Sequence, residues 1–297
     1  LMNINLTGGE PFLRKDIAEI ARCYFANTSI ESIFITSHGG LPDRIAKFTE
    51  DLGPVLGNRK IIFSFSIDDF EEQHNQNRKV KNLFQNVLES YRTVKKSSDN
   101  FMANVAITVS HTNHKIAMDL YHYLVDEQDV KAVTVTAVRD EGVYKIPLEE
   151  KKSILATYSQ LSERVASDMK SGKLDGYDTD TMLGRMMNKK NMLVNQIIKK
   201  TYLEPKYLSD CFAGSLFGVI GADGTVYPCE ILDRPIGSLR EYDYDLLALW
   251  NSPKVLETRK WIKDTKCNCT YECAWSLNVM GNWKYQAKMI SAALGNY

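Results

Sequence analysis

Five short apolar segments, each followed by a longer stretch with helical periodicity, constrain the fold of this chain more than any other feature. They are rich in Ile, Val, Phe and Thr, as β-strands are, and they cover residues 3–7, 32–37, 61–67, 102–109 and 131–138. Their first residues are 29, 29, 41 and 29 positions apart. One strand and its crossover helix take about 30 residues. The series therefore predicts a parallel sheet that is covered by helices, with right-handed connections.

The stretches between these segments have the charge and apolar spacing of helices. They cover residues 15–27, 42–52, 77–95 and 115–126. Five consecutive strand–helix units fit either an open doubly wound sheet or a complete or partial βα barrel. In both architectures the chemistry lies at the carboxyl ends of the strands.

The pattern changes twice after the last of these units. Residues 147–210 are charged and helical and contain Met-rich segments, which indicates a helical connector. From residue 211 the chain has a Gly- and Cys-bearing β pattern, with a hairpin signal at Asp223-Gly224 and one or two helices over 244–262. We predict three parts: a barrel-like domain over 1–146, the connector over 147–210, and a small hairpin-plus-helix domain over 211–297.

Charge and hydropathy exclude several classes of partner. Lys plus Arg and Asp plus Glu both number 37, so no global field attracts nucleic acid or an anionic membrane. No apolar run approaches the about 20 residues that span a bilayer, and the first residues are typical of a strand and not of a signal peptide. We therefore expect a cytoplasmic protein that binds neither nucleic acid nor membranes.

Five of the six cysteines lie between residues 211 and 273. The sixth, Cys23, belongs to a helical stretch, where we expect a small buried core residue. An odd number of clustered cysteines in a chain without an export signal argues against disulfides and for a metal site. The candidate metal ligands are Cys211, Cys229, Cys267, Cys269 and Cys273.

The spacing of these cysteines bears on the kind of metal. A hairpin brings Cys211 and Cys229 together, and the loop of Cys267, Cys269 and Cys273 is short enough to wrap the opposite side. Zinc ribbons usually use two Cys-x-x-Cys knuckles, whereas here one pair is widely spaced and the other group is a triplet. This favours an iron–sulfur cluster held by four thiolates. Zinc remains the alternative, and the sequence does not determine which four of the five cysteines are ligands.

Polar residues follow two of the predicted strands. The first strand ends in Gly8-Gly9-Glu10-Pro11, where two glycines allow a ligand to approach the backbone and Glu10 supplies a carboxylate. In the third strand, alternation places Ser64, Ser66 and Asp68 on one face. Burying these groups without partners is costly, so either a polar ligand or a hydrogen-bonded core network is expected there. We interpret His38 and His111, which follow two other strands, as loop residues.

In combination, these motifs resemble the radical S-adenosylmethionine (SAM) enzymes that carry a SPASM or twitch auxiliary-cluster domain. The resemblance is carried by Thr7–Pro11, by Ser66-Ile-Asp68-Asp69 with His74 and Arg78, and by Cys211-x12-Gly224-x4-Cys229. It implies that Gly8, Gly9, Glu10 and Pro11 form the site for the SAM amino group. It also implies that Ser64 and Ser66 face the methionyl or ribose part of SAM, and that Asp68 and Asn113 belong to the same site.

The sequence departs from this family in two ways. The family's Cys-x-x-x-Cys-x-x-Cys motif, which holds the SAM-cleaving cluster, occurs nowhere in the 297 residues, and the chain begins with Leu. We therefore expect an α/β fold consisting of a radical SAM partial (β/α) barrel whose first strand is missing, with a second 4Fe–4S cluster on the missing N-terminal segment. A degenerate homologue is the alternative. The compact Cys-x-Cys-x-x-x-Cys group indicates a single 4Fe–4S auxiliary cluster, nearer the twitch arrangement.

The resemblance implies a radical SAM oxidoreductase. Such an enzyme abstracts hydrogen from its substrate through a 5′-deoxyadenosyl radical, and here the substrate would be a ribosomal peptide or a small metabolite. The auxiliary cluster would bind substrate or accept an electron, and a flavodoxin or ferredoxin would supply electrons. The fragment alone is expected to be inactive, and no catalytic residue is identified. A non-catalytic iron–sulfur or zinc protein on the same scaffold is the alternative function.

Overall fold

The computed structural model describes residues 3–139, 141 and 145–295. It divides into two compact units, one of residues 1–138 with 156–176 and the other of residues 139–155 with 177–297. The chain passes between the units three times, and one of these boundaries falls within helix α6 (Leu148–Lys170). The three-part division at residues 146 and 210 stays a prediction.

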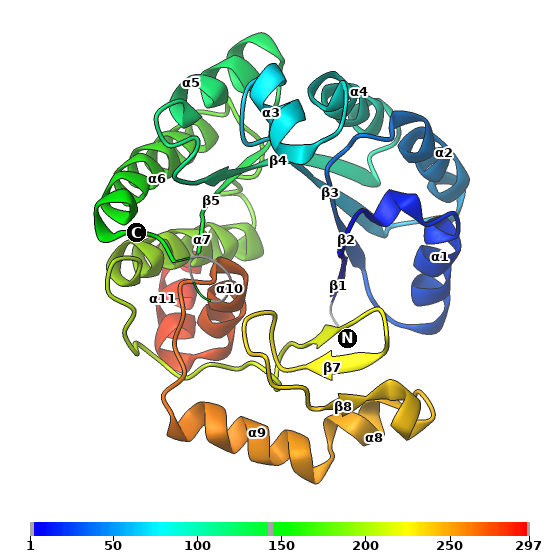
Figure 1. Cartoon of the computed structure of the whole chain (residues 1–297), viewed down its shortest axis with the longest axis vertical. Coiled ribbons are helices and arrows are strands. Elements are labelled where there is room, and N and C mark those ends of the chain that lie inside the picture. The colour runs from blue at the N-terminus through cyan, green and yellow to red at the C-terminus, as the bar shows by residue number, and fades with distance from the viewer. Residues whose placement is uncertain (1–2, 140, 142–144, 296–297) are drawn as a thin grey trace. The chain divides into compact units, whose positions relative to one another are not determined.

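A curved parallel sheet organises the first unit (Figure 1). Its strands are β1 (Asn3–Leu6), β2 (Ser32–Ser37), β3 (Lys60–Ser66), β4 (Phe101–Val109) and β5 (Val133–Ala137). Their spatial order is the order of the chain, and every neighbouring pair is parallel. A doubly wound sheet reverses its strand order at a switch point, and this sheet does not. The unit is therefore a partial (β/α) barrel, and the expected α/β fold is confirmed.

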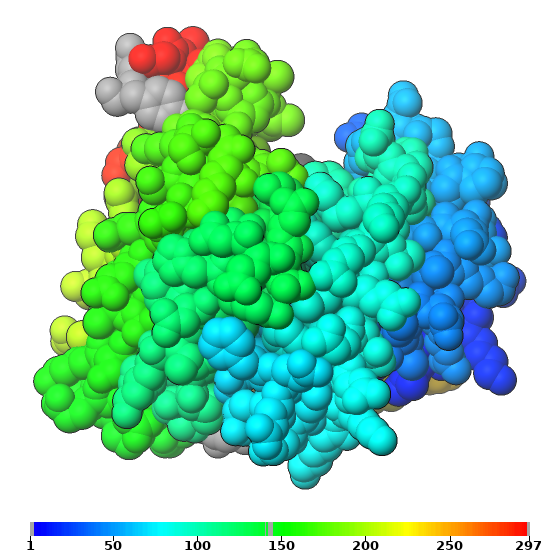
Figure 2. All heavy atoms as spheres, turned by 90° about the horizontal axis from the view of Figure 1, so that it is seen from above, coloured from blue at the N-terminus to red at the C-terminus, as the bar shows by residue number. Residues whose placement is uncertain are grey.

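Helices cover the convex side of this sheet. They are α1 (Ile17–Asn27), α2 (Pro42–Leu52), α3 (Glu71–Arg78), α4 (Leu83–Lys96) and α5 (Ala117–His122), with short turns η1 (Pro11–Leu13), η2 (Gly53–Val55) and η3 (Tyr123–Glu127). In the space-filling view of Figure 2, the blue-to-green segments of α2 to α5 form a continuous outer layer. The prediction of one helix over 77–95 was wrong, because Lys79 and Asn82 adopt left-handed φ values of 54° and 56° and separate α3 from α4.

The core of the first unit lies between the sheet and these helices. Alternation along β3 buries Ile61, Phe63 and Phe65 completely, and the Phe63 ring packs against Phe12 and Phe48 at centroid distances of 5.9 Å. Burying one such side chain contributes about 1.5–3 kcal/mol. The opposite face of β3, which carries the serines, is only half-buried, so the sheet has one packed face and one partly open face.

The second unit combines long helices with a small sheet. Helix α7 (Met182–Thr201) packs against α10 (Glu272–Gly281) and α11 (Trp283–Ala293). The predicted hairpin of β6 (Val219–Ile220) and β7 (Thr225–Tyr227) is present, and β8 (Gly237–Ser238) adds a third antiparallel strand. The remaining elements are η4 (Leu239–Tyr242), α8 (Leu246–Trp250) and α9 (Pro253–Asp264). Buried apolar side chains join this sheet to α8 and α9, namely Val226, Ile236, Leu249 and Val255.

Candidate functional site

The loop after β1 presents its backbone to open space. Gly8 has a φ of +130°, which favours glycine, and a Cβ atom at Gly8 or Gly9 would meet no atom within 4 Å. Pro11 is buried at the start of η1, where a fixed φ suits the first position of a helical turn. This corner, residues 8–11, is therefore fixed at its buried Pro11 end and presents a glycine backbone that a ligand can approach.

The Glu10 carboxylate at this corner is almost fully buried and well bonded. Its Oε1 accepts hydrogen bonds from the Phe12 amide at 3.0 Å and the Ser37 hydroxyl at 2.9 Å. Its Oε2 accepts the His38 amide at 2.8 Å and lies 3.4 Å from His38 Nε2. His38, interpreted above as a loop residue, therefore belongs to this site. Glu10 became a candidate because it follows a predicted strand. Ser37 and His38 also stand at the end of a predicted strand, so the same signal could have identified them.

A ladder of polar side chains crosses the open face of the sheet. Ser64 and Ser66 both lie on the half-buried face of β3. Asn104 donates to the Ser64 hydroxyl at 3.3 Å, and Thr134 donates to Asn104 at 3.1 Å. Within the described part of the chain, the Ser66 hydroxyl has no hydrogen-bond partner. Ser64 is thus part of a polar network, while Ser66 is available to a ligand.

Asp68 and Asn113 join two strand-end loops. Asp68 pairs with Arg78 at 2.6 Å and accepts the Thr108 amide at 2.9 Å. Asn113 is 1% exposed, and its amide nitrogen donates to the carbonyls of Asp68 at 2.7 Å and Thr108 at 2.9 Å. Its side-chain oxygen accepts the Ser110 amide at 2.7 Å. Because these bonds use the donors of Asn113, this residue shapes the site by holding its loops.

His74, which carries part of the family resemblance, is buried on α3. Its ring packs edge-on against Phe84 at a centroid distance of 6.1 Å, and its Nε2 has no hydrogen-bond partner among the described residues. Burial lowers the pKa of His74 to about 4, although the Asp68 charge opposes this shift. The imidazole is therefore neutral near pH 7 and contributes to packing.

Four of the five clustered cysteines influence one another. A hydrogen bond from the Cys267 thiol lowers the pKa of Cys211 and raises that of Cys267. Burial raises the pKa of Cys269 to about 12, and the charges of Cys211 and Cys229 act in the same direction. Cys267 and Cys269, whose pKa values are raised, need the positive charge of a metal to ionise together with Cys211. This donor set suits a metal centre.

Cys273 differs from these four. It is exposed, whereas Cys229 is buried and the others are partly buried. Burial raises the pKa of its thiol, and Cys273 lies near enough to Lys190 to oppose the lowering of that residue's pKa by burial. Cys23, expected to be a buried core residue, is also exposed, on α1. That expectation was wrong, because Cys23 lies on the outer side of its helix.

The shell around the thiols is apolar and offers hydrogen bonds to sulfur. Cys229 and Ile262 belong to one buried cluster, against which Cys211, Cys267 and Trp261 pack. The Leu232 amide donates to the Cys229 sulfur at 3.4 Å. Thiolates of one tetrahedral zinc lie about 4 Å apart, and no three His, Cys, Asp or Glu groups of the described residues are arranged to hold a single ion. The apolar shell and the amide–sulfur hydrogen bond suit an iron–sulfur cluster.

Charged residues distant in sequence clamp the cysteine-bearing segments. Arg139 donates to Glu230 at 2.8 Å, and its guanidinium lies 4.4 Å from the centre of the Tyr271 ring. The Tyr271 hydroxyl donates to the other oxygen of Glu230. Burial would raise the pKa of Glu230, but the hydrogen bonds from Tyr271 and Arg139 outweigh it and lower the pKa. Glu230 stays charged and links the hairpin cysteine to the cysteine loop.

A second clamp holds the middle of the cysteine loop. The Glu141 carboxylate accepts the Thr270 amide at 2.6 Å and the Thr270 hydroxyl at 2.7 Å. Thr270 is 4% exposed and directly follows Cys269. Sequence reasoning identified neither clamp, because nothing in the local pattern of residues 139–141 signals a contact with residues 230 or 270.

Comparison with known proteins defines the class of this cysteine-bearing region. Residues 211–274 match the SPASM family model, which describes an iron-sulfur cluster-binding domain. The match begins at Cys211, where the predicted C-terminal domain also begins. The second unit therefore contains a region that is similar to SPASM domains.

Particular relatives extend the comparison to the rest of the chain. The chain is 29% identical over 272 residues to the sporulation killing factor maturation protein SkfB of Bacillus subtilis (strain 168), covering 89% of this chain and 57% of SkfB. It thus spans little more than half the length of that relative. The fold is similar to native anSMEcpe with bound AdoMet and Kp18Cys peptide, with a TM-score of 0.57, 19% identity, and coverage of 99% of this chain and 85% of that chain.

A second structure, native anSMEcpe with bound AdoMet, has a TM-score of 0.59 and 20% identity, and the match covers 99% of this chain and 81% of that chain. These matches and the SPASM domain confirm the predicted resemblance to radical SAM proteins with an auxiliary iron–sulfur domain.

Proposed function

We propose that this protein is a radical SAM oxidoreductase that modifies a peptide. The observation that carries the proposal is the corner at Gly8–Glu10, where an open glycine backbone meets a buried carboxylate at the carboxyl end of β1. The same chain contains an iron–sulfur domain at residues 211–274. A peptide substrate is supported by the relatives, since SkfB is a maturation protein and anSMEcpe is seen with AdoMet and a peptide.

In this proposal each polar group at the sheet has a defined task. Gly8 and Gly9 admit SAM to the backbone, and Glu10 binds its amino group through a charge-assisted hydrogen bond. Ser64 and Ser66 contact its methionyl or ribose part, while Pro11, Asp68 and Asn113 hold the surrounding loops. When bound and reductively cleaved, SAM supplies a 5′-deoxyadenosyl radical that removes hydrogen from the substrate.

We assign the auxiliary 4Fe–4S cluster to Cys211, Cys229, Cys267 and Cys269. These thiols shift one another's pKa values, whereas Cys273 is exposed and no cysteine is among the groups that shift its pKa. Four thiolates would leave no iron open to substrate, so the cluster would exchange electrons with a carrier such as flavodoxin or ferredoxin. Reduced thiols of this kind persist in the cytoplasm. Among the described residues, none of the helices combines the length and apolar character that crossing a membrane requires.

Anaerobic reconstitution of the 297-residue chain tests the metal assignment. We expect about four irons per chain, retained in Cys273→Ala and lost in Cys269→Ala. Stoichiometric zinc without iron, or loss of iron in Cys273→Ala, would contradict the assignment. Calorimetry with SAM tests the other half of the proposal. An iron-loaded chain that binds no SAM would favour a non-catalytic iron–sulfur protein.

The 297 residues contain no Cys-x-x-x-Cys-x-x-Cys motif. The chain by itself is therefore expected to bind SAM without cleaving it. The measurement is 5′-deoxyadenosine release under reducing, anaerobic conditions, and release above the no-enzyme background would contradict this expectation.

A further inference from the structure

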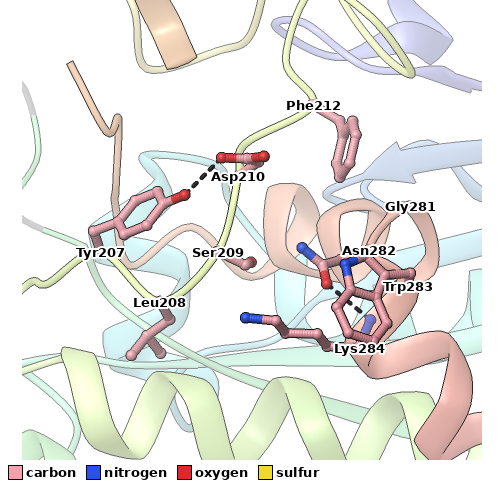
Figure 3. Close-up of a pocket in the computed structure, with 9 residues that line it drawn as sticks. All are labelled: Tyr207, Leu208, Ser209, Asp210, Phe212, Gly281, Asn282, Trp283 and Lys284. Carbon is pink, nitrogen blue, oxygen red and sulfur yellow. Dashed lines mark hydrogen bonds between the residues drawn. The ribbon is translucent and has the colours of Figure 1, made fainter. Parts of the chain in front are cut away.

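A hollow of about 270 Å³ lies beside the first cluster cysteine, within the second unit (Figure 3). One wall is the chain segment that leads into and past Cys211, and the other is the corner between α10 and α11. The lining residues are Tyr207, Leu208, Ser209, Asp210, Phe212, Gly281, Asn282, Trp283 and Lys284. A volume of this size accepts one or two amino-acid side chains.

The Ser209 hydroxyl is the first sign that the hollow receives a ligand. Ser209 is only 9% exposed, and its Oγ has no hydrogen-bond partner in the described part of the chain. Burying a hydroxyl without a partner costs free energy. Ser209 lines the hollow, so a polar group placed there would satisfy this hydroxyl.

The charges around the hollow indicate an anionic group. The Lys284 ammonium lies 5.8 Å from the centre of the Trp283 ring, and no ion pair joins it to a carboxylate of the described residues. Lys266 contributes a second ammonium, 5.8 Å from the Tyr207 ring. The one carboxylate of the lining, Asp210, already accepts the Tyr207 hydroxyl at 2.6 Å. Lys284 and Asp210 offset each other within the lining, and Lys266, beside Tyr207 but outside the lining, brings the sum of these three charges to +1.

The walls also offer apolar surface. The Trp283 side chain is 71% exposed and Tyr207 is 39% exposed, and Phe212 completes an aromatic lining. Exposed aromatic side chains beside convergent polar groups are typical of recognition sites. The hollow thus matches a ligand that carries a carboxylate next to an apolar group.

We propose that this hollow binds an extended peptide segment that presents an Asp or Glu side chain beside a large apolar side chain. The inference rests on the proposed function, because the peptide is taken to be the substrate. The carboxylate would meet Lys284 and Ser209, and the apolar side chain would pack on Trp283. The Phe212 amide donates to Asn278 at 2.8 Å, and Asn278 also bonds to Cys211. A peptide held here would lie next to the residues that carry the first cluster ligand.

Two fluorescein-labelled peptides test this proposal by anisotropy on the reconstituted 297-residue chain. They are Gly-Ser-Leu-Asp-Leu-Ser-Gly and the same peptide with Asn in place of Asp. We expect the Asp peptide to bind about tenfold more tightly, as one charge-assisted hydrogen bond predicts. Lys284→Gln and Ser209→Val should remove most of this difference. Trp283→Ala should weaken both peptides equally, because it removes apolar contact.

Lys288→Ala is the matched control, since Lys288 is on the same helix beside Tyr285 and outside the hollow. This variant should leave the about tenfold difference in Kd between the two peptides unchanged. Thermal unfolding of each variant verifies that it is folded. Equal binding of the two peptides, or an unchanged difference in Lys284→Gln, would overturn the proposal. Competition by succinate at the same concentration as the peptide would also overturn it, by assigning the hollow to free carboxylic acids.

Iron content and SAM binding, measured on the same samples, separate this inference from the proposed function. If a sample binds neither iron nor SAM but still prefers the Asp peptide, the proposed function is contradicted and the hollow is supported as a peptide site. If a sample binds iron and SAM but shows no preference between the peptides, the proposed function is supported and the peptide site is contradicted.

Discussion

The side-chain amide of Asn113 donates a hydrogen bond to the backbone carbonyl of Asp68 at 2.7 Å. Two residues that resemble SAM-site residues in the sequence are thus bonded directly to each other. The bond joins the loop after β3 to the loop after β4, at the end of the sheet where the candidate site lies. The bond keeps these two loops in register.

Asn113→Ala should therefore act mainly on stability. It would leave two carbonyls and one amide without their partner in a buried loop, and we expect a loss of about 2–4 kcal/mol in the free energy of unfolding. Urea denaturation measures this loss. Asn77→Ala, at an exposed position of α3, is the control and should change it by less than about 0.5 kcal/mol. Equal effects of the two variants would show that the Asn113 bonds contribute little.

Glu10→Gln should lower both the stability of the folded chain and its affinity for SAM. A glutamine has one acceptor oxygen, so its NH₂ group must face either the His38 amide or the Phe12 and Ser37 donors. We expect a loss of about 1–3 kcal/mol in unfolding free energy and at least about tenfold weaker SAM binding by calorimetry. Wild-type SAM affinity in this variant would remove Glu10 from the ligand site.

Gly39 and Gly57 form a matched pair, because both have positive φ values, of +68° and +58°. A Cβ at Gly39 would lie 2.5 Å from Val87 Cγ2, whereas one at Gly57 would meet nothing within 4 Å. We expect Gly57→Ala to cost about 1–2 kcal/mol from backbone strain. Gly39→Ala should cost a further ~1–3 kcal/mol from overpacking. Thermal or urea unfolding of both variants provides the comparison, and equal losses would contradict the close packing of Gly39 against α4.

His74 should make stability depend on pH below neutrality. Its pKa is about 4 in the folded chain and about 6.5 when unfolded. Between these values only the unfolded chain binds the proton, so stability rises with pH there. The contribution is complete above about pH 6.5 and is lost as the pH falls towards 4, on the order of 3 kcal/mol in total.

His74→Phe removes this titration while keeping the packing against Phe84. The slope of unfolding free energy between pH 4 and 6.5 should fall by about 1.4 kcal/mol per pH unit. His111→Gln, at an exposed loop position, should leave the slope unchanged. An unaltered slope in His74→Phe would mean that His74 is protonated in the folded chain.

Glu141→Ala should loosen the iron site without removing a ligand. It frees the buried amide and hydroxyl of Thr270 beside Cys269, and unsatisfied buried donors favour local opening. We expect several-fold faster iron release to a chelator. Glu149→Ala, at an exposed ion pair with Lys152, is the control. An unchanged release rate in Glu141→Ala would show that this clamp does not limit opening of the loop.

Local patterns predicted much of the architecture. The alternation in β3 placed Phe63 and Phe65 on one face and Ser64 and Ser66 on the other, and the structure agrees. The strand spacing predicted parallel pairing, and the cysteine spacing predicted an iron–sulfur domain that the family comparison confirms. The break between α3 and α4 escaped prediction. Lys79 is a good helix former, and although Asn tolerates left-handed geometry, nothing in the local sequence signals that both Lys79 and Asn82 adopt it.

The sequence by itself determined the features that depend on neighbouring residues along the chain. These are the faces of the strands, the hairpin at Asp223-Gly224 and the grouping of five cysteines. Side-chain direction and turn preference follow from covalent geometry, so they can be read locally. Only the tertiary structure decided that the strands follow chain order, that Cys273 differs from the other four, and that Ser209 and Lys284 share a hollow. These outcomes depend on the free energy of packing and hydrogen bonding between segments 40 to 130 residues apart, such as Glu141 with Thr270, and no local pattern records that balance.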